Sequence, residues 1–495
     1  MTDEPNDLRV HRLQKLSDIR ASGVDPYKSK FDRDRLVAEI DASYGAIEPE
    51  VHTADVVSIA GRLMALRRHG KASFAELQDK TGRVQLYLTA DALGEEAYDT
   101  FLSYDIGDIV GVTGEVFKTK RGQLSVAVAS YELLTKSLRP MPEKWHGLKD
   151  VETRYRQRYL DLIMNPDVKE TFIKKTRTIA ILRRILDEQG FLEVETPMLH
   201  PIPGGAAAKP FITHHNALDT DLYLRIAPEL YLKRLIVGGL ERVYEINKSF
   251  RNEGISVKHN PEFMMLEAYQ AYADYQDMME LVETLINGVI EELAGSTKIT
   301  YQETELDFTR PWRRLSMIDA VKEYTGQDLS FDMSLDDLKA LAAEMRVDLK
   351  PNSGKGAVIT EIYEKHVEHL IVQPTFVFDY PLETSPLARK KPGNPELTER
   401  FELIIAGREV ANAFSELTDP QDQHARFEAQ QANKAAGDEE AHELDEDYVM
   451  ALEHGLPPTG GIGIGVDRLV MIVTDSASIR DVILFPQLKT KPSEE

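Results

Sequence analysis

The chain has 495 residues, enough for roughly two to four domains with buried cores. Its 42% hydrophobic and 29% charged content is that of a globular protein, and no apolar run approaches the ~18 residues of a membrane span. The absence of cysteine excludes disulfides, thiol nucleophiles and cysteine zinc sites. The start, MTDEPNDLRV, lacks the basic and apolar segments of a signal peptide, so we expect a cytoplasmic protein.

The charge is unevenly distributed along the chain. A net charge of −24 argues against a protein that coats nucleic acid, but residues 1–150 carry only −3 of it and the rest carry −21. Within the first part, residues 61–85 hold six lysines and arginines against Glu76 and Asp79. A locally basic segment can meet a polyanion because binding follows the local field. The alternative interpretation is a solvated strand face.

The first 137 residues predict a helical segment followed by a small barrel. Residues 8–45 show the charged pattern of helices, interrupted by a turn between Gly23 and Pro26. From about residue 54 onward, five short alternating runs are separated by glycine-containing turns, with a helical stretch, ALGEEAYDTFL, between the third and fourth. This pattern predicts a five-stranded β-barrel of the OB type, which binds oligonucleotides on one strand face and its loops.

Two side chains of the predicted barrel suit contact with nucleotides. Phe74 could stack a base, and the Gln85 amide could read a base edge. The alternative is that Phe74 fills the barrel interior.

A linker and a larger mixed domain follow. Residues 137–150, SLRPMPEKWHGLKD, contain two prolines and a glycine. We therefore expect a helical segment at 1–50, the barrel at 51–137, a linker at 138–165 and an α+β domain at 166–495, with a helical insertion around 316–372. Within that domain, TFIKKTRTIAILRRILDEQG predicts an amphipathic helix capped by Gly190, and FLEVETPML predicts a strand that ends at Pro197.

The segment FRNEGISVKHNPEF, residues 250–263, is the first candidate for chemistry. The chain holds neither GxxxxGK[ST] nor GxGxxG, so any nucleotide must bind without those phosphate loops. Two strands joined by the loop GISVKHN would place Arg251 on one arm, and His259 and Phe263 on the other. Arg251 can grip a phosphate in a bidentate way, and Phe263 can stack a purine. The alternative is a surface hairpin without a ligand.

Two further segments carry candidate groups. In GGIGIGVDRLVM, alternating glycines let another group approach the bare strand, and Arg468 follows at the predicted start of a helix, where anions are favoured. In FELIIAGREVANAFSEL, carboxylates recur at Glu402, Glu409 and Glu416. Carboxylates near phosphates suggest magnesium, and one left over could meet a cationic substrate, as could Glu229. Close strand packing and solvated acids are the alternatives.

Together these segments resemble the three signature motifs of class II aminoacyl-tRNA synthetases. GFLEVETPML is similar to the first motif, FRNE with HNPEF to the second, and GIGIGVDRLVM to the third. The strongest resemblance is to bacterial lysyl-tRNA synthetases, and it spans nearly the whole chain. It implies an α+β protein with an N-terminal five-stranded OB-type barrel and a catalytic domain built on an antiparallel sheet flanked by helices.

The resemblance also implies an activity and its partners. ATP would activate lysine to lysyl-adenylate, and the lysyl group would pass to the 3′ end of tRNA(Lys). Mg²⁺ would bind with ATP, and no zinc is expected. The first motif would form the interface of a homodimer, and neither a membrane nor DNA is an expected partner.

The resemblance assigns roles to individual residues. Arg251 and Arg468 would be the catalytic residues. The ATP-binding set would be Arg251, Glu253, His259, Asn260, Phe263 and Arg468. The lysine-binding set would be Gly205, Glu229, Glu267, Tyr269, Asn412 and Glu416. Glu402 and Glu409 would hold the metal, and Arg62, Arg67, Phe74 and Gln85 would read the anticodon. Met264 and Ala268 depart from the family pattern, but neither is an expected ligand.

Three other functions share parts of this pattern. An aspartyl- or asparaginyl-tRNA synthetase would need a cation or amide donors where this chain has Glu229 and Glu416. A ligase that attaches lysine to a protein would lack the N-terminal barrel. A non-catalytic relative would have lost catalytic residues such as Arg251 and Arg468, which are present.

Overall fold

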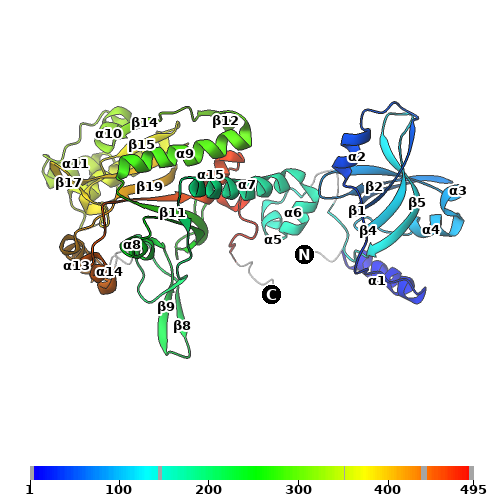
Figure 1. Cartoon of the computed structure of the whole chain (residues 1–495), viewed down its shortest axis with the longest axis horizontal. Helices are drawn as coiled ribbons and strands as arrows, with labels where there is room; N and C mark the ends of the chain where they lie inside the picture. The colour runs from blue at the N-terminus through cyan, green and yellow to red at the C-terminus, as the bar shows by residue number, and fades with distance from the viewer. Residues whose placement is uncertain (1–4, 143–147, 351, 436–442, 490–495) are drawn as a thin grey trace. The chain divides into compact units, whose positions relative to one another are not determined.

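The computed structural model describes residues 5–142, 148–350, 352–435 and 443–489, and the chain divides into two compact units, residues 1–147 and 148–495 (Figure 1). Within the described residues, no helix is long and apolar enough to cross a membrane.

The first unit is a closed barrel with helices around it. Its strands pair in the order β1-β2-β3-β5-β4. The strands are β1 (His52–His69), β2 (Ala72–Gln78), β3 (Arg83–Thr89), β4 (Ile109–Lys118) and β5 (Leu124–Thr135). The helices are α1 (Pro5–Ala21), α2 (Val37–Tyr44), α3 (Ala90–Leu93) and α4 (Glu95–Leu102). Strict alternation of buried and less buried residues along β2 and β3 puts one face of each strand into the barrel core.

The second unit is built on an eight-stranded sheet in the order β14-β15-β18-β19-β20-β11-β10-β6. Only the two outermost pairs, β14 with β15 and β10 with β6, are parallel among these strands. The strands are β6 (Leu192–Glu193), β10 (Arg242–Phe250), β11 (Glu262–Ala271), β14 (Arg313–Ser316), β15 (Thr375–Phe378), β18 (Arg400–Ile404), β19 (Glu409–Ser415) and β20 (Thr459–Gly465).

Three helices cover one face of this sheet and form the main apolar core with it (Figure 1). They are α7 (Pro166–Glu188), α9 (Tyr275–Ala294) and α15 (Val466–Val473). α7 buries Ile181, Leu182, Ile185 and Leu186, which recur at helical spacing. The opposite face of the sheet is therefore free of these helices.

The remaining elements lie at the edges of the sheet or in its connections. A projecting three-stranded sheet holds β7 (Leu199–His200), β9 (Thr220–Leu224) and β8 (Ile212–His215), and two small hairpins join β12 (Lys298–Tyr301) to β13 (Thr304–Asp307) and β16 (Lys390–Lys391) to β17 (Asn394–Thr398). The other helices are α5 (Val151–Arg156), α6 (Arg158–Met164), α8 (Glu229–Val237), α10 (Met317–Thr325), α11 (Leu335–Glu344), α12 (Lys355–His366), α13 (Pro420–Ala435) and α14 (Glu446–Glu453).

Two predicted boundaries need correction. Residues 148–165 were predicted as linker, but they form α5 and α6 within the second unit. The buried Arg158 holds these helices against the rest of the unit, because it donates to the carbonyls of Arg480 and Leu484 and pairs with Asp161 at 2.6 Å. Residues 143–147 of the predicted linker lie outside the described residues. The strand predicted up to Pro197 is shorter, since β6 contains only Leu192 and Glu193.

The predicted insertion around 316–372 has its own core. Helices α10, α11 and α12 bury a cluster that includes Met317, Leu338 and Ile362, together with Val377 and Ile404 of the sheet. The region is therefore packed onto strands β15 and β18 and is not a loose surface addition.

Candidate active site

A cavity of about 350 Å³ lies against the sheet. Along the strands it is lined mainly by the residues that alternate with those buried in the helix-covered core. On β11, Met265, Glu267 and Tyr269 line the cavity, whereas the intervening Leu266 and Ala268 belong to the core. Strands β18, β19 and β20 show the same alternation, with Glu402, Asn412 and Gly463 on the cavity side. The period of two along a strand thus gathers polar groups from four neighbouring strands onto one surface.

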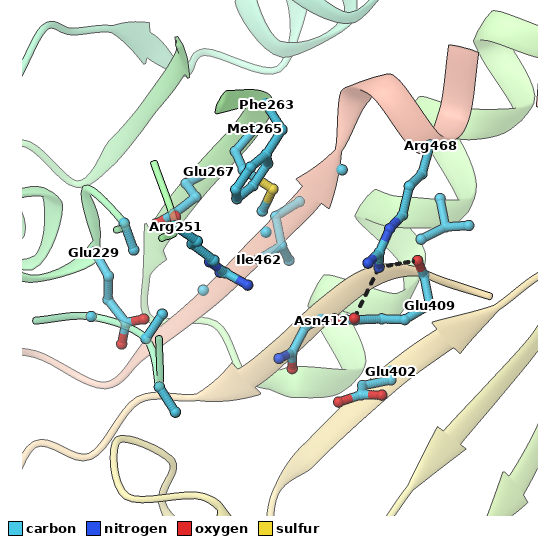
Figure 2. A pocket seen from close by; sticks show the side chains of 18 of the residues that line it. Glu229, Arg251, Phe263, Met265, Glu267, Glu402, Glu409, Asn412, Ile462 and Arg468 are labelled. Carbon is cyan, nitrogen blue, oxygen red and sulfur yellow. Dashed lines mark hydrogen bonds and ion pairs between the residues drawn. The ribbon is translucent and has the colours of Figure 1, made fainter. Parts of the chain in front are cut away.

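Every residue predicted to bind ATP, lysine or metal lines this cavity, with the exception of Glu416. Figure 2 shows Glu229 at one end, the pair Arg468 and Glu409 at the other, and Arg251 between them. The cavity therefore has an anionic end and an end that presents arginines.

The hairpin of β10 and β11 positions Arg251 and Phe263 as the sequence predicts. Ser249 pairs with Phe263 across the strands, and the Arg251 amide donates to the Pro261 carbonyl at 2.9 Å. The Arg251 guanidinium lies 5.1 Å from the centre of the Phe263 ring. Burial lowers the pKa of Arg251, and its Nε has no hydrogen-bond partner among the described residues. A half-buried guanidinium with a buried, unused donor is suited to an anionic ligand.

The connecting loop carries the other predicted ATP contacts. His259 is exposed and its Nδ1 lies 3.0 Å from the Ser256 hydroxyl. Partial desolvation of the ring and the nearby Arg468 lower the pKa of His259. Asn260 is buried, and its Oδ1 has no partner among the described residues. Glu253 is exposed at the rim of the cavity.

Each of the two predicted metal ligands is paired with an arginine. Arg468, in the first turn of α15, donates to the Glu409 carboxylate at 3.0 Å and to the Glu409 carbonyl at 2.7 Å (Figure 2). Arg400 donates to Glu402 at 2.6 Å. Burial and the neighbouring charge of Glu409 raise the pKa of Glu402, whereas Arg468 lowers the pKa of Glu409. The pairing with Arg468 thus favours the ionised form of Glu409.

No cluster of three or more histidine, aspartate or glutamate side chains suited to a metal exists within the described ranges. Glu402 and Glu409 both line the cavity, and their carboxylate oxygens are of the kind that magnesium binds together with phosphate oxygens and water.

The anionic end contains an ion-paired lysine that the sequence analysis did not identify. Lys233 of α8 lies 2.5 Å from Glu229 Oε1 and also forms an ion pair with Glu416. Glu416 is 1% exposed and does not line the cavity, but its Oε1 has no hydrogen-bond partner among the described side chains. Burial raises the pKa of both carboxyl groups against the lowering effect of Lys233.

Glu267 and Tyr269 complete this end from β11. The Tyr269 hydroxyl donates to Glu267 at 3.0 Å, and both side chains are buried. Burial together with Glu229 raises the pKa of Glu267 to about 8. An added ammonium group would reverse these shifts, because an opposite charge favours the ionised carboxyl.

Two glycines keep the anionic end open. A Cβ on Gly461 would lie 2.0 Å from Glu416 Oε1 and 2.6 Å from Tyr269 Cε1. A Cβ on Gly205 would lie 3.1 Å from both Ala227 and Glu229, and its φ of +89° favours glycine.

The four predicted anticodon residues lie on the barrel. Phe74 of β2 alternates with core residues and points outward, and its ring lies 5.2 Å from that of Tyr87 on β3. Gln85 shares this outer face and donates to Ser125 at 3.0 Å. Arg67 pairs with Phe74 across β1 and β2. Arg62 is held differently, because it donates to the Gly107 carbonyl at 2.7 Å.

Several cavity residues were missed by the sequence analysis. They are Lys258, Arg400 and Phe414, together with Lys233 behind the wall. Signals existed for three of them. Lys233 follows Glu229 by one helical turn, and Arg400 and Phe414 each lie two residues from a predicted ligand on the same strand.

Comparison with known proteins agrees with this geometry. Residues 150–489 match the family of tRNA synthetases class II (D, K and N), and residues 57–134 match an OB-fold nucleic acid binding domain. A lysine–tRNA ligase of Carboxydothermus hydrogenoformans is 57% identical, with 99% of each chain covered. That of Moorella thermoacetica is 57% identical with 98% of each covered, and that of Bacillus subtilis is 53% identical with 99% of this chain and 98% of the relative covered.

The barrel, the antiparallel sheet and the cavity upon it are those of a class II aminoacyl-tRNA synthetase with an N-terminal OB-fold domain. Within this class the chain belongs to the lysine–tRNA ligase family. It is therefore an enzyme that activates lysine and charges tRNA with it.

Proposed function

We propose that the cavity binds ATP and lysine side by side and that the arrangement of its charges directs the reaction. One observation carries the proposal: a single cavity presents Arg468 toward one region and the carboxylates Glu229 and Glu267 toward another, with Arg251 between them (Figure 2). ATP brings phosphates, and lysine brings two ammonium groups and a carboxylate. Only one relative orientation of the substrates satisfies both regions.

Arg251, Arg468 and His259 would hold the phosphates. Arg251 would contact the α-phosphate, because it lies between the two regions, and Phe263 would stack the adenine beside it. Arg468 and His259 would hold the outer phosphates. Arg468 would exchange its partner Glu409 for a phosphate, since the two ligands compete for one guanidinium.

The lysine carboxylate would then attack the α-phosphorus in line. The new bond joins a carboxylate oxygen to phosphorus, and the bond to the bridging oxygen breaks to release pyrophosphate. No covalent enzyme intermediate is required, so the protein contributes position and charge. The 3′ hydroxyl of tRNA(Lys) would subsequently take the lysyl group, and AMP would leave.

Glu229, Glu416 and Glu267 would recognise the ammonium groups of lysine. Glu229 and Glu416 would bind the side-chain ammonium at the anionic end of the cavity, whereas Glu267, next to Arg251, would bind the α-ammonium. Tyr269, Asn412 and Gly205 would complete the walls. A substrate without the second cation would leave buried carboxylates unpaired, which costs several kcal/mol by order of magnitude.

Glu402 and Glu409 would hold magnesium together with phosphate oxygens of ATP. The ion would neutralise the charge that develops on the leaving pyrophosphate. Release of Glu409 from Arg468 would provide one of the ligands.

The outer face of the barrel around Phe74 and Gln85 would read the anticodon, with Arg67 providing charge. Arg62 would act there only after leaving the Gly107 carbonyl.

We also propose a cytoplasmic homodimer. Exposed apolar side chains in and near the first motif support a dimer interface, namely Ile173, Leu192, Leu199 and Ile212. Sedimentation of the whole chain at micromolar concentration would test the dimer, and a monomer would contradict it.

Pyrophosphate–ATP exchange with each of the twenty amino acids tests the central proposal. We expect exchange with lysine alone and its loss, by about a hundredfold or more, in Arg251→Ala, because an arginine that contacts the transferring phosphate stabilises the transition state. Arg314→Ala is the matched control, since Arg314 is exposed. Exchange with aspartate or asparagine would overturn the assignment of the anionic region.

A further inference from the structure

Behind the wall of the anionic end of the cavity, the protein already holds an ammonium group of its own, that of Lys233. Lys233 is completely buried, and its Nζ lies 2.5 Å from Glu229, against the Glu416 carboxylate and 5.3 Å from the centre of the Phe414 ring. Two carboxylates and an aromatic face are the groups that would recognise the ammonium of a lysine substrate. The protein therefore shares these groups between its own lysine and a ligand.

The two carboxylates retain capacity for a second cation. Lys233 uses one oxygen of Glu229 and one of Glu416. Glu416 Oε1 is buried without a hydrogen-bond partner in the described part of the chain, and it faces the bare Cα of Gly461, which lines the cavity. Glu229 itself lines the cavity. Two negative charges and one positive charge leave one net negative charge for the ligand.

We propose that Lys233 is a positioning and specificity-determining residue, which clamps Glu229 and Glu416 and cancels one of their two charges so that the subsite accepts one ammonium group. This inference rests on the proposed lysine subsite and adds a residue that does not touch the substrate. Its position one helical turn after Glu229 holds the ammonium between the carboxylates at a fixed place.

Within the described part of the chain, no second cation forms an ion pair with Glu229 or Glu416. The charged or titratable groups that face the pair are Glu267 and Tyr269 of β11, Tyr448 of α14 and, further away, Arg400 of β18. The first three add no positive charge. Without Lys233, Glu229 and Glu416 would face each other in a buried site, so one of them would keep a proton at pH 7 and lose it only at higher pH.

The decisive variants are Lys233→Met, Glu416→Gln and the double variant, each measured in lysine-dependent pyrophosphate–ATP exchange. Methionine fills the volume of the side chain without its charge. In the wild-type background, we expect Lys233→Met to change the KM for lysine less than about threefold at pH 7, because the proton that the unpaired carboxylates bind leaves the same net charge as Lys233 does. The KM for lysine should then fall more steeply than in the wild type as the pH rises to 8.5, because that proton is lost, while the KM for ATP changes less than twofold.

The same substitution should have a clear effect at pH 7 when Glu416 is neutral. In Glu416→Gln, Lys233 cancels the only remaining charge, so lysine binds weakly. Adding Lys233→Met then restores one net negative charge on Glu229, and the KM for lysine should fall about tenfold relative to Glu416→Gln alone. A lysine that only supports the fold cannot produce this fall. If Lys233→Met raises the KM for lysine in the Glu416→Gln background or leaves it unchanged there, the inference is wrong.

A matched control distinguishes the effect of the Lys233 charge on the subsite from the general effect of losing a buried ion pair. Lys136 of the barrel is 3% exposed and lies 2.9 Å from Asp108, so Lys136→Met removes a similar pair far along the chain from the cavity residues. We expect it to lower thermal stability and leave the KM for lysine unchanged. If Lys233→Met does not fold, the double variant, which buries no unpaired ammonium, is compared with Glu416→Gln. An unchanged KM for lysine in Glu416→Gln would instead refute the proposed lysine subsite.

Discussion

Gly461 illustrates how a missing side chain shapes the proposed lysine subsite. At Gly461, β20 passes close to both Glu416 and Tyr269, so a Cβ at this position would collide with both side chains. Gly463 also lines the cavity, yet a Cβ there would meet nothing closer than 3.2 Å. The glycines of β20 are therefore unequal in their tolerance of substitution.

Gly461→Ala should obstruct the anionic end of the cavity. The added methyl group would displace the Glu416 carboxylate or the Tyr269 ring, so we expect the KM for lysine to rise at least about tenfold, while the KM for ATP changes little. Exchange kinetics with each substrate varied in turn would measure this split. Gly82→Ala is the control, because its Cβ would make only an ordinary contact with Val37 at 3.4 Å. Equal effects of the two variants would contradict the assignment.

Glu267 should make lysine binding depend on pH. Its carboxyl has a pKa of about 8 in the ligand-free protein, and binding of an ammonium lowers that pKa, so the bound state holds fewer protons. Lysine affinity should therefore increase as the pH rises toward 8, by about three- to tenfold per pH unit, and then level off. The measurement is kcat/KM for lysine between pH 6.5 and 8.5 at saturating ATP and Mg²⁺. Glu267→Gln should flatten this dependence, and an equally steep slope in that variant would refute the role.

At the scale of elements, the site depends on four antiparallel strands that keep the same alternation. Asn412 of β19 pairs with Glu402 of β18 and with Gly463 of β20, and Gly463 in turn pairs with Glu267 of β11. These residues occupy one row across the sheet. A shift of one residue in any strand would turn its polar groups into the helix-covered core, so the register and the site stabilise each other.

The adjacent strands β18 and β19 should set the requirement for magnesium. We expect Glu402→Gln to raise the Mg²⁺ concentration for half-maximal exchange about tenfold, because a carboxamide is a weaker ligand than a carboxylate and retains the pairing with Arg400 less well. A titration with Mg²⁺ at fixed ATP measures the effect. The control is Glu396→Gln on β17, whose side chain is exposed. An unchanged titration in Glu402→Gln would refute the ligand assignment.

At the scale of the whole molecule, two units with different chemistry share one chain. The barrel and the large sheet have separate apolar cores, and the strong negative charge belongs to the sequence of the second unit. Under the proposed function, activation of lysine would require only groups of the cavity, whereas recognition of tRNA would also require the barrel surface.

Phe74→Ala should therefore impair charging and spare activation. Loss of a stacking platform typically costs ~1–3 kcal/mol per base, which corresponds to a rise of about five- to a hundredfold in the KM for tRNA. Pyrophosphate–ATP exchange should remain within twofold of the wild type. Val56→Ala is the control in the same barrel, since Val56 is 62% exposed on β1. Loss of exchange in Phe74→Ala would show that the substitution acts on the fold instead.

Local patterns in the sequence were sufficient for much of this description. The five alternating runs predicted the barrel, and the three motifs supported the class and family, which the comparisons confirm. Hydrophobic periodicity reports which face of a strand is buried, and glycine marks positions of close approach, so Arg251, Phe263 and Arg468 could be proposed before the fold was seen. The helices within residues 148–165 were not predicted, because Arg158 is held by hydrogen bonds to carbonyls more than 300 positions away in the sequence.

The sequence by itself determined the two kinds of domain, the family and the residue types available for phosphates and ammonium groups, because these depend on short-range periodicity and on motifs. Only the tertiary structure decided which charges meet. Lys233 and Glu416 are 183 residues apart, and Arg468 and Glu409 are 59 apart, yet each forms an ion pair. Such pairs follow from strand order and burial, which remove water and force each charge to find a partner nearby.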